Sequence, residues 1–267
     1  MDPRTMHLSA LWVYPLKSCA GVAVDRWPLD ADGLRYDRSW MVVDPDGEFL
    51  TQREEPRLAL ARPRWSGDGW DVDVAGEDRF QLPLRVSGPT VPATVWGHTG
   101  PAVDAGDLPA AALSRLLDRP VRLVGLADDH DRRADPGYGA DEAPVGFSDG
   151  FPLLVSTDAS LADLNRRLPT PLPMRRFRPN LVISGSSPWA EDDWRRVVVG
   201  AATLDVVKPC SRCTITTVDP DRGVRDGGEP LRTLGTFRRG ERGVIFGQNA
   251  VPRSTATVAV GDPVTVG

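Results

Sequence analysis

Apolar and polar residues alternate in short stretches along most of the chain, and clusters of glycine, proline and aspartate separate these stretches. An alternation of period two is typical of strands that bury one face. We expect strands over residues 8–14, 40–43, 48–51, 70–74, 80–84, 94–96, 181–184, 196–199, 203–207, 214–218, 244–246, 255–260 and 263–266. The pattern therefore predicts a mainly β (α+β) fold with few helices.

Two segments have helical spacing instead. Leucines three and four residues apart predict helices over 107–117 and 157–168, because these positions share one helix face. Asp107 is the expected N-cap of the first helix, and Ser156, Thr157 or Asp158 the expected cap of the second. Pro169 ends the second helix.

Turn-forming residues mark the breaks between these elements. The segments 44–47 and 219–223 combine Asp, Pro and Gly and predict tight turns between strands. Residues 125–146 are rich in Asp, Gly, Pro and Ala, so we expect a linker or mobile loop there. Since 267 residues suit two lobes, we predict domains at 1–125 and 126–267.

Composition indicates a globular protein without nucleic-acid or membrane partners. The net charge of −5 gives no overall basic surface, and no apolar run at the start is long enough for a signal or a membrane span. Three cysteines without an export signal predict free thiols in the cytoplasm. Lysine is rare, and both lysines, Lys17 and Lys208, lie two residues before a cysteine.

The strongest candidate for chemistry is the Cys-x-x-Cys segment at 210–213. A zinc site needs four ligands, and only Cys19 and three scattered histidines remain to complete one. A thioredoxin-like pair should begin a helix, whereas the expected strand 214–218 follows here. The remaining reading is a loop at the entrance to that strand, where Arg212 and Lys208 favour a thiolate. Two ordinary buried cysteines stay an open alternative.

Further polar residues lie at predicted strand ends, where side chains of a β framework converge. Lys17, Ser18, Arg38, Arg178 and Asn180 have this placement. Arginine and lysine would suit a phosphate, and the amide and hydroxyl groups a heterocycle. Each of these residues taken alone is also compatible with an ordinary solvated surface position. Motifs of serine hydrolases, dinucleotide-binding folds and P-loops are absent from the sequence.

The sequence resembles a known family in several segments. Residues 11–19 and 33–40 resemble the N-terminal β-barrel domain that accompanies MOSC domains. Residues 160–165, 177–180, 210–220 and 246–249 resemble the MOSC domain itself. The resemblance is strongest to the mitochondrial amidoxime-reducing components and their bacterial counterparts. It implies an N-terminal β-barrel-like lobe followed by a C-terminal MOSC β-barrel with a few short helices.

The same resemblance implies a molybdenum cofactor, Mo-molybdopterin, with Cys213 as the metal ligand and catalytic residue. The residues that match cofactor-binding positions of the family are Lys17, Ser18, Arg38, Ser148, Asp149, Arg178, Asn180, Ser211 and Arg212. Gly150 stands where relatives often carry a hydroxyl residue. Cys19 and Cys210 have no ligand role in this scheme.

The resemblance also implies an oxidoreductase for N-hydroxylated small molecules such as amidoximes, hydroxylamines and N-hydroxylated bases. Because the iron–sulfur extension of some bacterial relatives and the mitochondrial membrane anchor are not in this sequence, we expect electrons from a separate soluble ferredoxin-like or cytochrome-like protein or a reductase. A monomer is expected. The alternative is a non-catalytic carrier or insertion factor for the same cofactor.

Overall fold

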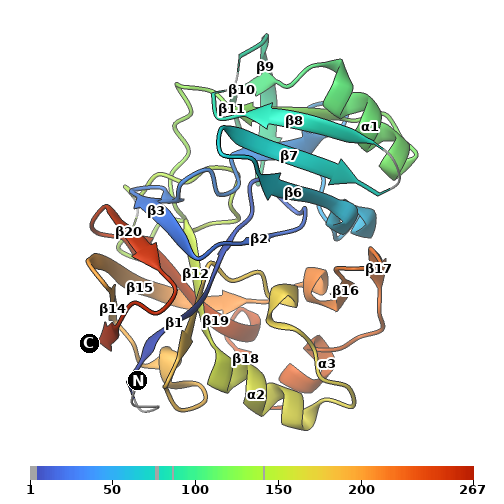
Figure 1. Ribbon diagram of the computed structural model, residues 1–267. Coiled ribbons are helices and arrows are strands. Elements are labelled where there is room, and N and C mark those ends of the chain that lie inside the picture. The colour runs from blue at the N-terminus through green and yellow to red at the C-terminus, as the bar shows by residue number, and fades with distance from the viewer. Residues whose placement is uncertain (1–4, 76–77, 86, 141) are drawn as a thin grey trace.

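The computed structural model describes residues 5–75, 78–85, 87–140 and 142–267. Figure 1 shows two lobes, with β5 to β11 and α1 above and the larger C-terminal part of the chain below. Most regular elements are strands, and this confirms the predicted mainly β fold.

The largest sheet runs through the lower lobe in the order β2-β1-β13-β12-β19-β15-β14-β21, with β18 paired to β19. Its strands are β1 His7–Val13, β2 Val22–Ala23, β12 Leu153–Thr157, β13 Leu181–Ser184, β14 Arg196–Val199, β15 Ala202–Ser211, β18 Arg239–Gly240, β19 Gly243–Pro252 and β21 Val264–Val266. The first strand of the chain therefore belongs to the lower lobe, where β1 pairs antiparallel with β13.

The upper lobe contains two smaller sheets. One has the order β5-β11-β10-β9 and the other β6-β7-β8. Their strands are β5 Trp40–Val43, β6 Ala61–Trp65, β7 Gly69–Val74, β8 Arg79–Pro83, β9 Thr90–Val95, β10 His98–Asp104 and β11 Arg122–Leu126.

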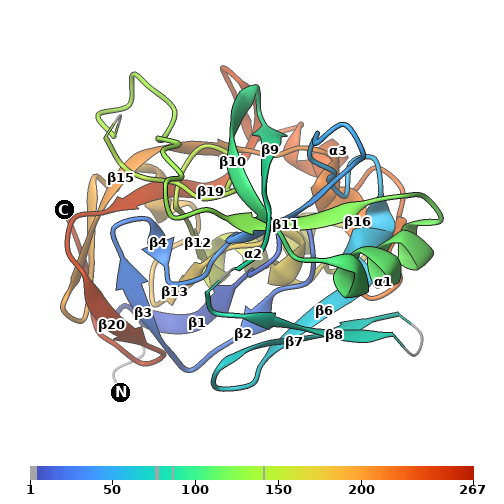
Figure 2. The ribbon, with the colours of Figure 1, turned by 90° about the horizontal axis from the view of Figure 1, so that it is seen from above.

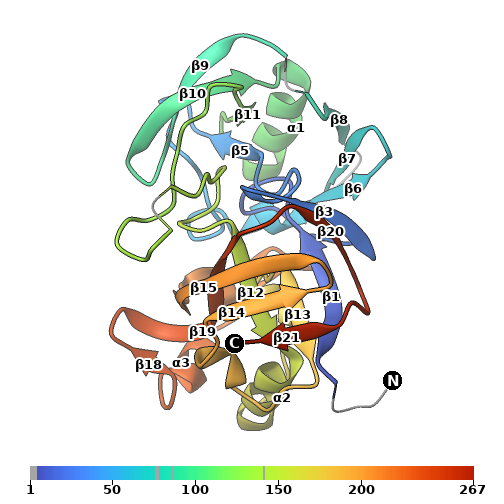
Figure 3. The same cartoon turned by 90° about the vertical axis from the view of Figure 1, so that its left-hand side faces the viewer.

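A fourth sheet joins a strand from near the start of the chain to one from near its end. It has the order β20-β3-β4, with β3 Arg26–Asp30, β4 Gly33–Leu34 and β20 Ala256–Ala259. Figure 3 shows β20 in red beside β3 in blue between the lobes, and Figure 2 shows this pair on the side of the molecule opposite α1. Strands from both sides of the predicted boundary at 125 thus pair at β1–β13 and β3–β20, while the boundary itself stays a prediction.

The two longer helices lie where leucine spacing predicts them. They are α1 Asp107–Leu117 and α2 Asp158–Arg167, and α3 Leu231–Leu234 is a single turn. The cap of α2 is Thr157, whose side chain accepts a hydrogen bond from the Ser160 amide. Asp107 is not a cap, because the N-cap of α1 is Gly106 with a φ of 88° and Asp107 is the first helical residue. No helix in the described part of the chain is both long and apolar enough to cross a membrane.

Two of the expected strands are wrong. Residues Thr214–Thr217 form the 3₁₀ helix η4, followed only by the short β16 Val218–Asp219, which pairs with β17 Val224–Arg225. The hydroxyls of Thr216 and Thr217 donate to carbonyls three residues back, and such local bonds compete with a strand ladder. Residues 48–51 make only isolated bridges, although the turn before them forms with Gly47 at a φ of 82°.

The remaining 3₁₀ turns are η1 Pro56–Leu60, η2 Met174–Arg176 and η3 Ala190–Asp192. The predicted turn at 219–223 forms as well, with the Gly223 amide donating to the Asp219 carbonyl at 2.8 Å. Of the 3₁₀ turns, η4 contributes Ile215 to the site described below.

The predicted linker has no helix or strand between 127 and 146 in its described residues. It is nevertheless packed, because Ala134, Ala143 and Val145 are buried in a small cluster with Phe151 and Val251. Aspartate, glycine and alanine thus form an ordered connection along the lower lobe rather than a free tether.

Candidate functional site

A cleft at the seam of the lobes brings all of the predicted site residues together. It is lined by Lys17, Ser18, Arg38, Ser148, Asp149, Arg178, Asn180, Ser211, Arg212 and Cys213, together with Gly150, Phe151, Leu153, Leu154, Phe177, Cys210, Ile215 and Asn249. We call it the cationic cleft. It encloses about 730 Å³ of empty space, including the part that is open to solvent. Residues almost 200 positions apart in the sequence therefore line the same cleft.

Cys213 lies between the end of β15 and the start of η4. Its thiol is half-buried and lines the cleft. The backbone here is fixed by Thr216, whose amide and hydroxyl both donate to the Cys213 carbonyl, at 3.2 and 2.9 Å. The thiol is thus presented at the exit of a strand and the beginning of a helical turn, not at the entrance to a strand as expected.

Arg212 contacts the other cysteine of the motif. Its Nη1 lies 2.9 Å from Cys210 Sγ, and its Nη2 donates to the Phe177 carbonyl at 2.6 Å. Residues two apart in an extended segment point to the same side, which explains why Arg212 faces Cys210 and not Cys213. Lys208 is also turned away and lies 3.4 Å from Asp135. The expectation that these two cations flank the Cys213 thiol is therefore wrong.

Lys17 is a buried cation at the opposite wall. Its Nζ donates to Asp149 Oδ1 at 2.6 Å and to the Phe147 carbonyl at 2.8 Å. Only 4% of the Lys17 side chain is exposed, and burial lowers its pKa while Asp149 opposes that effect. Burial therefore disfavours the charged form of Lys17, and the Asp149 carboxylate favours it.

Two arginines of the cleft contact the same aromatic ring. The guanidinium carbons of Arg38 and Arg178 lie 4.4 and 4.3 Å from the centroid of the Tyr14 ring. A Cβ at Gly21 would lie 2.4 Å from Tyr14 Cε1, so only glycine fits against the ring there. Contacts of this kind attract a cation but leave its charge uncancelled.

Arg178 has no acidic partner among the described residues. Its Nη1 donates to the Cys19 carbonyl at 2.5 Å. Burial, and next the nearby Arg38, lower the pKa of Arg178 to about 10, so it stays protonated at neutral pH. An oxyanion in the cleft would supply the charge that the protein lacks here.

Arg38 is held more fully. It pairs with Asp37 and donates to Asn180 Oδ1 at 3.1 Å. Asn180 is 1% exposed, and its other bonds go to the Leu154 amide and the Trp12 carbonyl. Asn180 thus fixes the position of Arg38 and lies deeper than the cleft surface.

Backbone strain concentrates at the same place. Ser18, Arg38 and Arg178 have φ values of 63°, 47° and 56°. Such left-handed conformations cost non-glycine residues about 1 kcal/mol or more, and they persist where the surroundings impose them, often at functional sites. Three predicted cofactor residues share this feature.

Comparison with known proteins agrees with this geometry. The model of the MOSC N-terminal beta barrel domain matches residues 5–120, and the model of the MOSC domain matches residues 142–265. Human mitochondrial amidoxime-reducing component 1 is 38% identical over 278 residues, which cover 96% of this chain and 82% of that protein. This chain belongs to that family of MOSC proteins.

Other members of the family show the same extent of similarity. The mouse mitochondrial amidoxime-reducing component 1 is 37% identical and covers 96% of this chain and 81% of its own length. The bovine mitochondrial amidoxime reducing component 2 is 34% identical, with 96% and 82% covered. The match to the family thus includes both lobes and every residue of the cationic cleft.

Sequence reasoning missed the residue that shapes one wall of this MOSC site. Arg132, in the connection between the lobes, is 7% exposed. Its guanidinium donates to the carbonyls of Gly146, Ser148 and Asp149 at 2.9, 2.6 and 2.5 Å. The loop that carries Ser148 and Asp149 is therefore clamped through its backbone. Nothing in the sequence distinguishes Arg132 from its neighbour Arg133.

Trp96 is a second residue that was missed. It lies in the turn between β9 and β10, where its Nε1 donates to Asp149 Oδ1 at 3.2 Å. The Arg53 guanidinium lies 4.5 Å from its ring centroid, and the ring is 45% exposed. Trp96 thus forms an exposed aromatic rim next to the Lys17–Asp149 pair.

The residues of the cleft fit a phosphate-bearing cofactor with a metal. Two of its cations, Arg178 and Arg212, have no carboxylate partner among the described residues, and the buried Nε of Arg212 has no hydrogen-bond partner there either. In the described part of the chain, no group of three or more His, Cys, Asp or Glu side chains could hold a metal ion. A metal at Cys213 would therefore draw its other ligands from a bound molecule.

Proposed function

We propose that this protein is a molybdenum-cofactor-dependent reductase of N-hydroxylated small molecules such as amidoximes, hydroxylamines and N-hydroxylated bases. Its relatives are named amidoxime-reducing components. The observation that carries the proposal is the half-buried Cys213 thiol in a cleft where Arg178 and Arg212 have no carboxylate partner among the described residues. A soft thiolate is a suitable ligand for a thiophilic metal.

In this proposal Cys213 is the one protein ligand of the metal. Lys17, Arg38 and Arg178 bind the phosphate of the cofactor, since Arg38 and Arg178 are fixed beside one another on the Tyr14 ring. Ser18, Ser148, Asp149, Ser211 and Arg212 supply hydrogen bonds to the rest of the cofactor. The cofactor, when bound, supplies the two-electron chemistry, and the protein orients it and adjusts its electronic environment.

Asn180 has a positioning role in the proposal. All of its side-chain bonds are to the protein, and one of them holds the Arg38 guanidinium. The strained backbone at Arg38 and Arg178 keeps both cations in place before the cofactor binds, which lowers the ordering cost of binding.

The remaining parts of the proposal concern the surroundings of the enzyme. Electrons come from a separate soluble electron-transfer protein of the ferredoxin or cytochrome type, or from a reductase. The protein acts in the cytoplasm as a monomer. The absence of a regular basic surface at a net charge of −5 is in keeping with small-molecule chemistry.

The decisive experiment is metal and pterin analysis of the protein and of two matched variants. The chain is expressed in a host that makes the cofactor, and reduction of benzamidoxime is measured with a chemical electron donor. Cys213→Ala should lose molybdenum and activity, whereas Cys210→Ala should keep most of both. Equal losses would show that the two cysteines act as a dithiol.

Two other outcomes would contradict the proposal. If the protein purified from a host that makes the cofactor contained neither molybdenum nor pterin, the reductase proposal would have no basis. Rapid transfer of bound cofactor to a cofactor-free enzyme, without reduction of benzamidoxime, would identify a cofactor carrier instead.

A further inference from the structure

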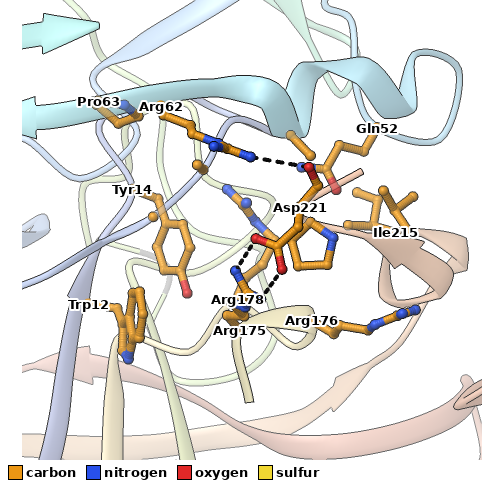
Figure 4. Close-up of a pocket in the computed structure, with 15 residues that line it drawn as sticks. Trp12, Tyr14, Gln52, Arg62, Pro63, Arg175, Arg176, Arg178, Ile215 and Asp221 are labelled. Atoms are coloured by element: carbon orange, nitrogen blue, oxygen red, sulfur yellow. Dashed lines mark hydrogen bonds and ion pairs between the residues drawn. The ribbon is translucent and has the colours of Figure 1, made fainter. Parts of the chain in front are cut away.

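A second cavity lies behind the cationic cleft, between η1 and β6 of the upper lobe and η2, η4 and β16 of the lower lobe. We call it the seam cavity. It encloses about 860 Å³ including its open part and is lined by Trp12, Tyr14, Ala20, Gly21, Gln52, Ala59, Arg62, Pro63, Arg175, Arg176, Arg178, Ile215, Val218, Pro220 and Asp221. Figure 4 shows Tyr14 and Trp12 on one side and Arg62, Arg175 and Asp221 across from them. Cys213 does not line it.

The seam cavity has a surplus of hydrogen-bond donors at its positive side chains. The single carboxylate in its wall, Asp221, is bound by both Nη atoms of Arg175. Arg62 has only the main-chain carbonyl of Asp221, at 3.1 Å, and Arg178 only the carbonyl of Cys19. Within the described residues, neither Arg62 nor Arg178 has a carboxylate partner, so most of their N–H groups lack an acceptor from the protein.

Two further donors at this cavity are buried without any partner. They are the Tyr14 hydroxyl and the Nε of Arg176. Tyr14 is 1% exposed, and burial raises its pKa to about 12, which keeps the hydroxyl protonated. Buried polar groups normally find a hydrogen-bond partner, and those that do not call for an explanation. Both atoms belong to side chains that line the seam cavity, although the atoms themselves are shielded from solvent.

The other walls of the cavity are flat and apolar. Figure 4 shows Trp12 and Pro63 on the side of the cavity across from Ile215, and Pro220 also lines it. A ring that enters between them would be removed from water, while its charged end reached the arginines. Molecules that have both an aromatic body and an anionic group should therefore bind best. The ring alone contacts only the apolar wall, and the anionic group alone contacts only the arginines.

We propose that the seam cavity is a second ligand site, which binds a small aromatic carboxylate independently of the cofactor. The carboxylate accepts hydrogen bonds from Arg62 and its neighbours, and the ring packs on Trp12 and Pro63. Arg178 and Ile215 line both the seam cavity and the cationic cleft, so the ligand lies directly behind the cofactor site.

Titration of the cofactor-loaded protein with benzoate tests this proposal. Two comparison ligands separate the parts of the interaction: acetate has the charge without the ring, and benzamide the ring without the charge. Benzoate should bind at least about tenfold more tightly than either, since each comparison ligand lacks a charge-assisted bond or the apolar contact. Calorimetry gives the affinities, and Trp12→Phe should remove the fluorescence change on binding.

Two matched substitutions in the same strand locate the site. Arg62 and Arg64 lie two residues apart in β6, but Arg64 pairs with Asp73 and does not line the cavity. Arg62→Gln should weaken benzoate binding by about tenfold or more, and Arg64→Gln should leave it unchanged. Both variants must show the far-UV circular dichroism of the parent protein.

Several results would overturn the proposal. Equal affinities for benzoate and benzamide would show that the arginines take no part. Equal effects of Arg62→Gln and Arg64→Gln would place the ligand elsewhere. Binding to cofactor-free protein alone would show that the cofactor site is the one that takes benzoate. None of these results bears on the molybdenum content or on benzamidoxime reduction, so the reductase proposal is tested separately.

Discussion

Arg122 on the outer surface and two arginines at the seam of the lobes, Arg132 and Arg178, are held in different ways. On the surface, Arg122 donates through two nitrogens to the carboxylate of Asp104, at 2.8 and 2.6 Å. At the seam, Arg132 and Arg178 donate to main-chain carbonyls and have no acidic partner among the described residues. A carbonyl satisfies the N–H groups but does not cancel the positive charge.

This difference separates two uses of the same side chain. A paired surface arginine contributes little to stability and presents almost no net charge. A buried arginine with no carboxylate partner and few hydrogen bonds, such as Arg178, raises the free energy of the folded protein, and an anionic ligand can recover that energy on binding. At the seam, the charge of Arg178 is therefore available to an anionic ligand, whereas Arg122 on the surface already has its carboxylate partner.

The three cysteines also differ in burial, and this difference gives the largest effect that we expect. Cys19 is fully buried, and burial raises its pKa to about 12, whereas Cys210 and Cys213 are half-buried at the cleft. In cofactor-free protein at pH 8.5, iodoacetamide should alkylate Cys19 about 10³-fold more slowly than a free thiol, because its thiolate is so scarce. Mass spectrometry of the three cysteine peptides measures the rates.

The pH dependence of folding supplies the matching test for Cys19. Its folded pKa lies above the unfolded value of about 8.5, so its contribution to stability is fully present below that pH. The contribution is lost as the pH rises toward about 12, and Cys19→Ala should reduce this loss. Rapid alkylation of Cys19 in the folded protein at pH 8.5 would contradict the burial.

Substitution of Arg132 and of its neighbour Arg133 tests whether Arg132 holds the loop that carries Ser148 and Asp149. Arg132→Met should lower the free energy of unfolding by about 3 kcal/mol, since three carbonyls lose a charged donor. Arg133 is exposed and, among the described residues, donates to the Glu142 carbonyl alone, so Arg133→Met should have a much smaller effect. Urea unfolding of both variants measures the difference, and equal effects would show that the clamp has no special role.

Arg178 should show the opposite balance between binding and stability. Arg178→Met should weaken cofactor retention by about tenfold or more, because the proposal assigns Arg178 to the phosphate of the cofactor. The free energy of unfolding of cofactor-free protein should change by less than about 1 kcal/mol, since a buried charge without a partner is removed. Molybdenum content after dialysis and urea unfolding are the two measurements. A large loss in the free energy of unfolding, together with full retention of the cofactor, would contradict this prediction.

The surface pair should give the smallest effect. Arg122→Met should lower the free energy of unfolding by less than about 1 kcal/mol, because the Arg122 side chain is 39% exposed and solvent screens the pair. Cofactor retention should not change. A loss of stability as large as that expected for Arg132→Met would show that pairing with a carboxylate, and not burial, decides the contribution of these arginines.

The sequence predicted the elements whose pattern is local and regular. Period-two alternation identified β1, β5, β7 and β8, and leucine spacing identified α1 and α2. It failed at 214–218, because β-branched residues favour strands on average while the threonine hydroxyls here bond to the backbone of η4. Strand ends with basic residues, together with the resemblance to MOSC proteins, identified the residues that line the cleft.

By itself, therefore, the sequence determined the mainly β fold, the two longer helices and the identity of the cleft residues. Tertiary structure alone decided that Arg212 faces Cys210, that two guanidinium groups lie 4.4 and 4.3 Å from the centroid of the Tyr14 ring, and that Arg132 holds a loop of the cleft. The physical reason is that local pattern follows from backbone periodicity and side-chain propensity. The partner of a charged side chain depends instead on which distant segments the fold brings within hydrogen-bond distance.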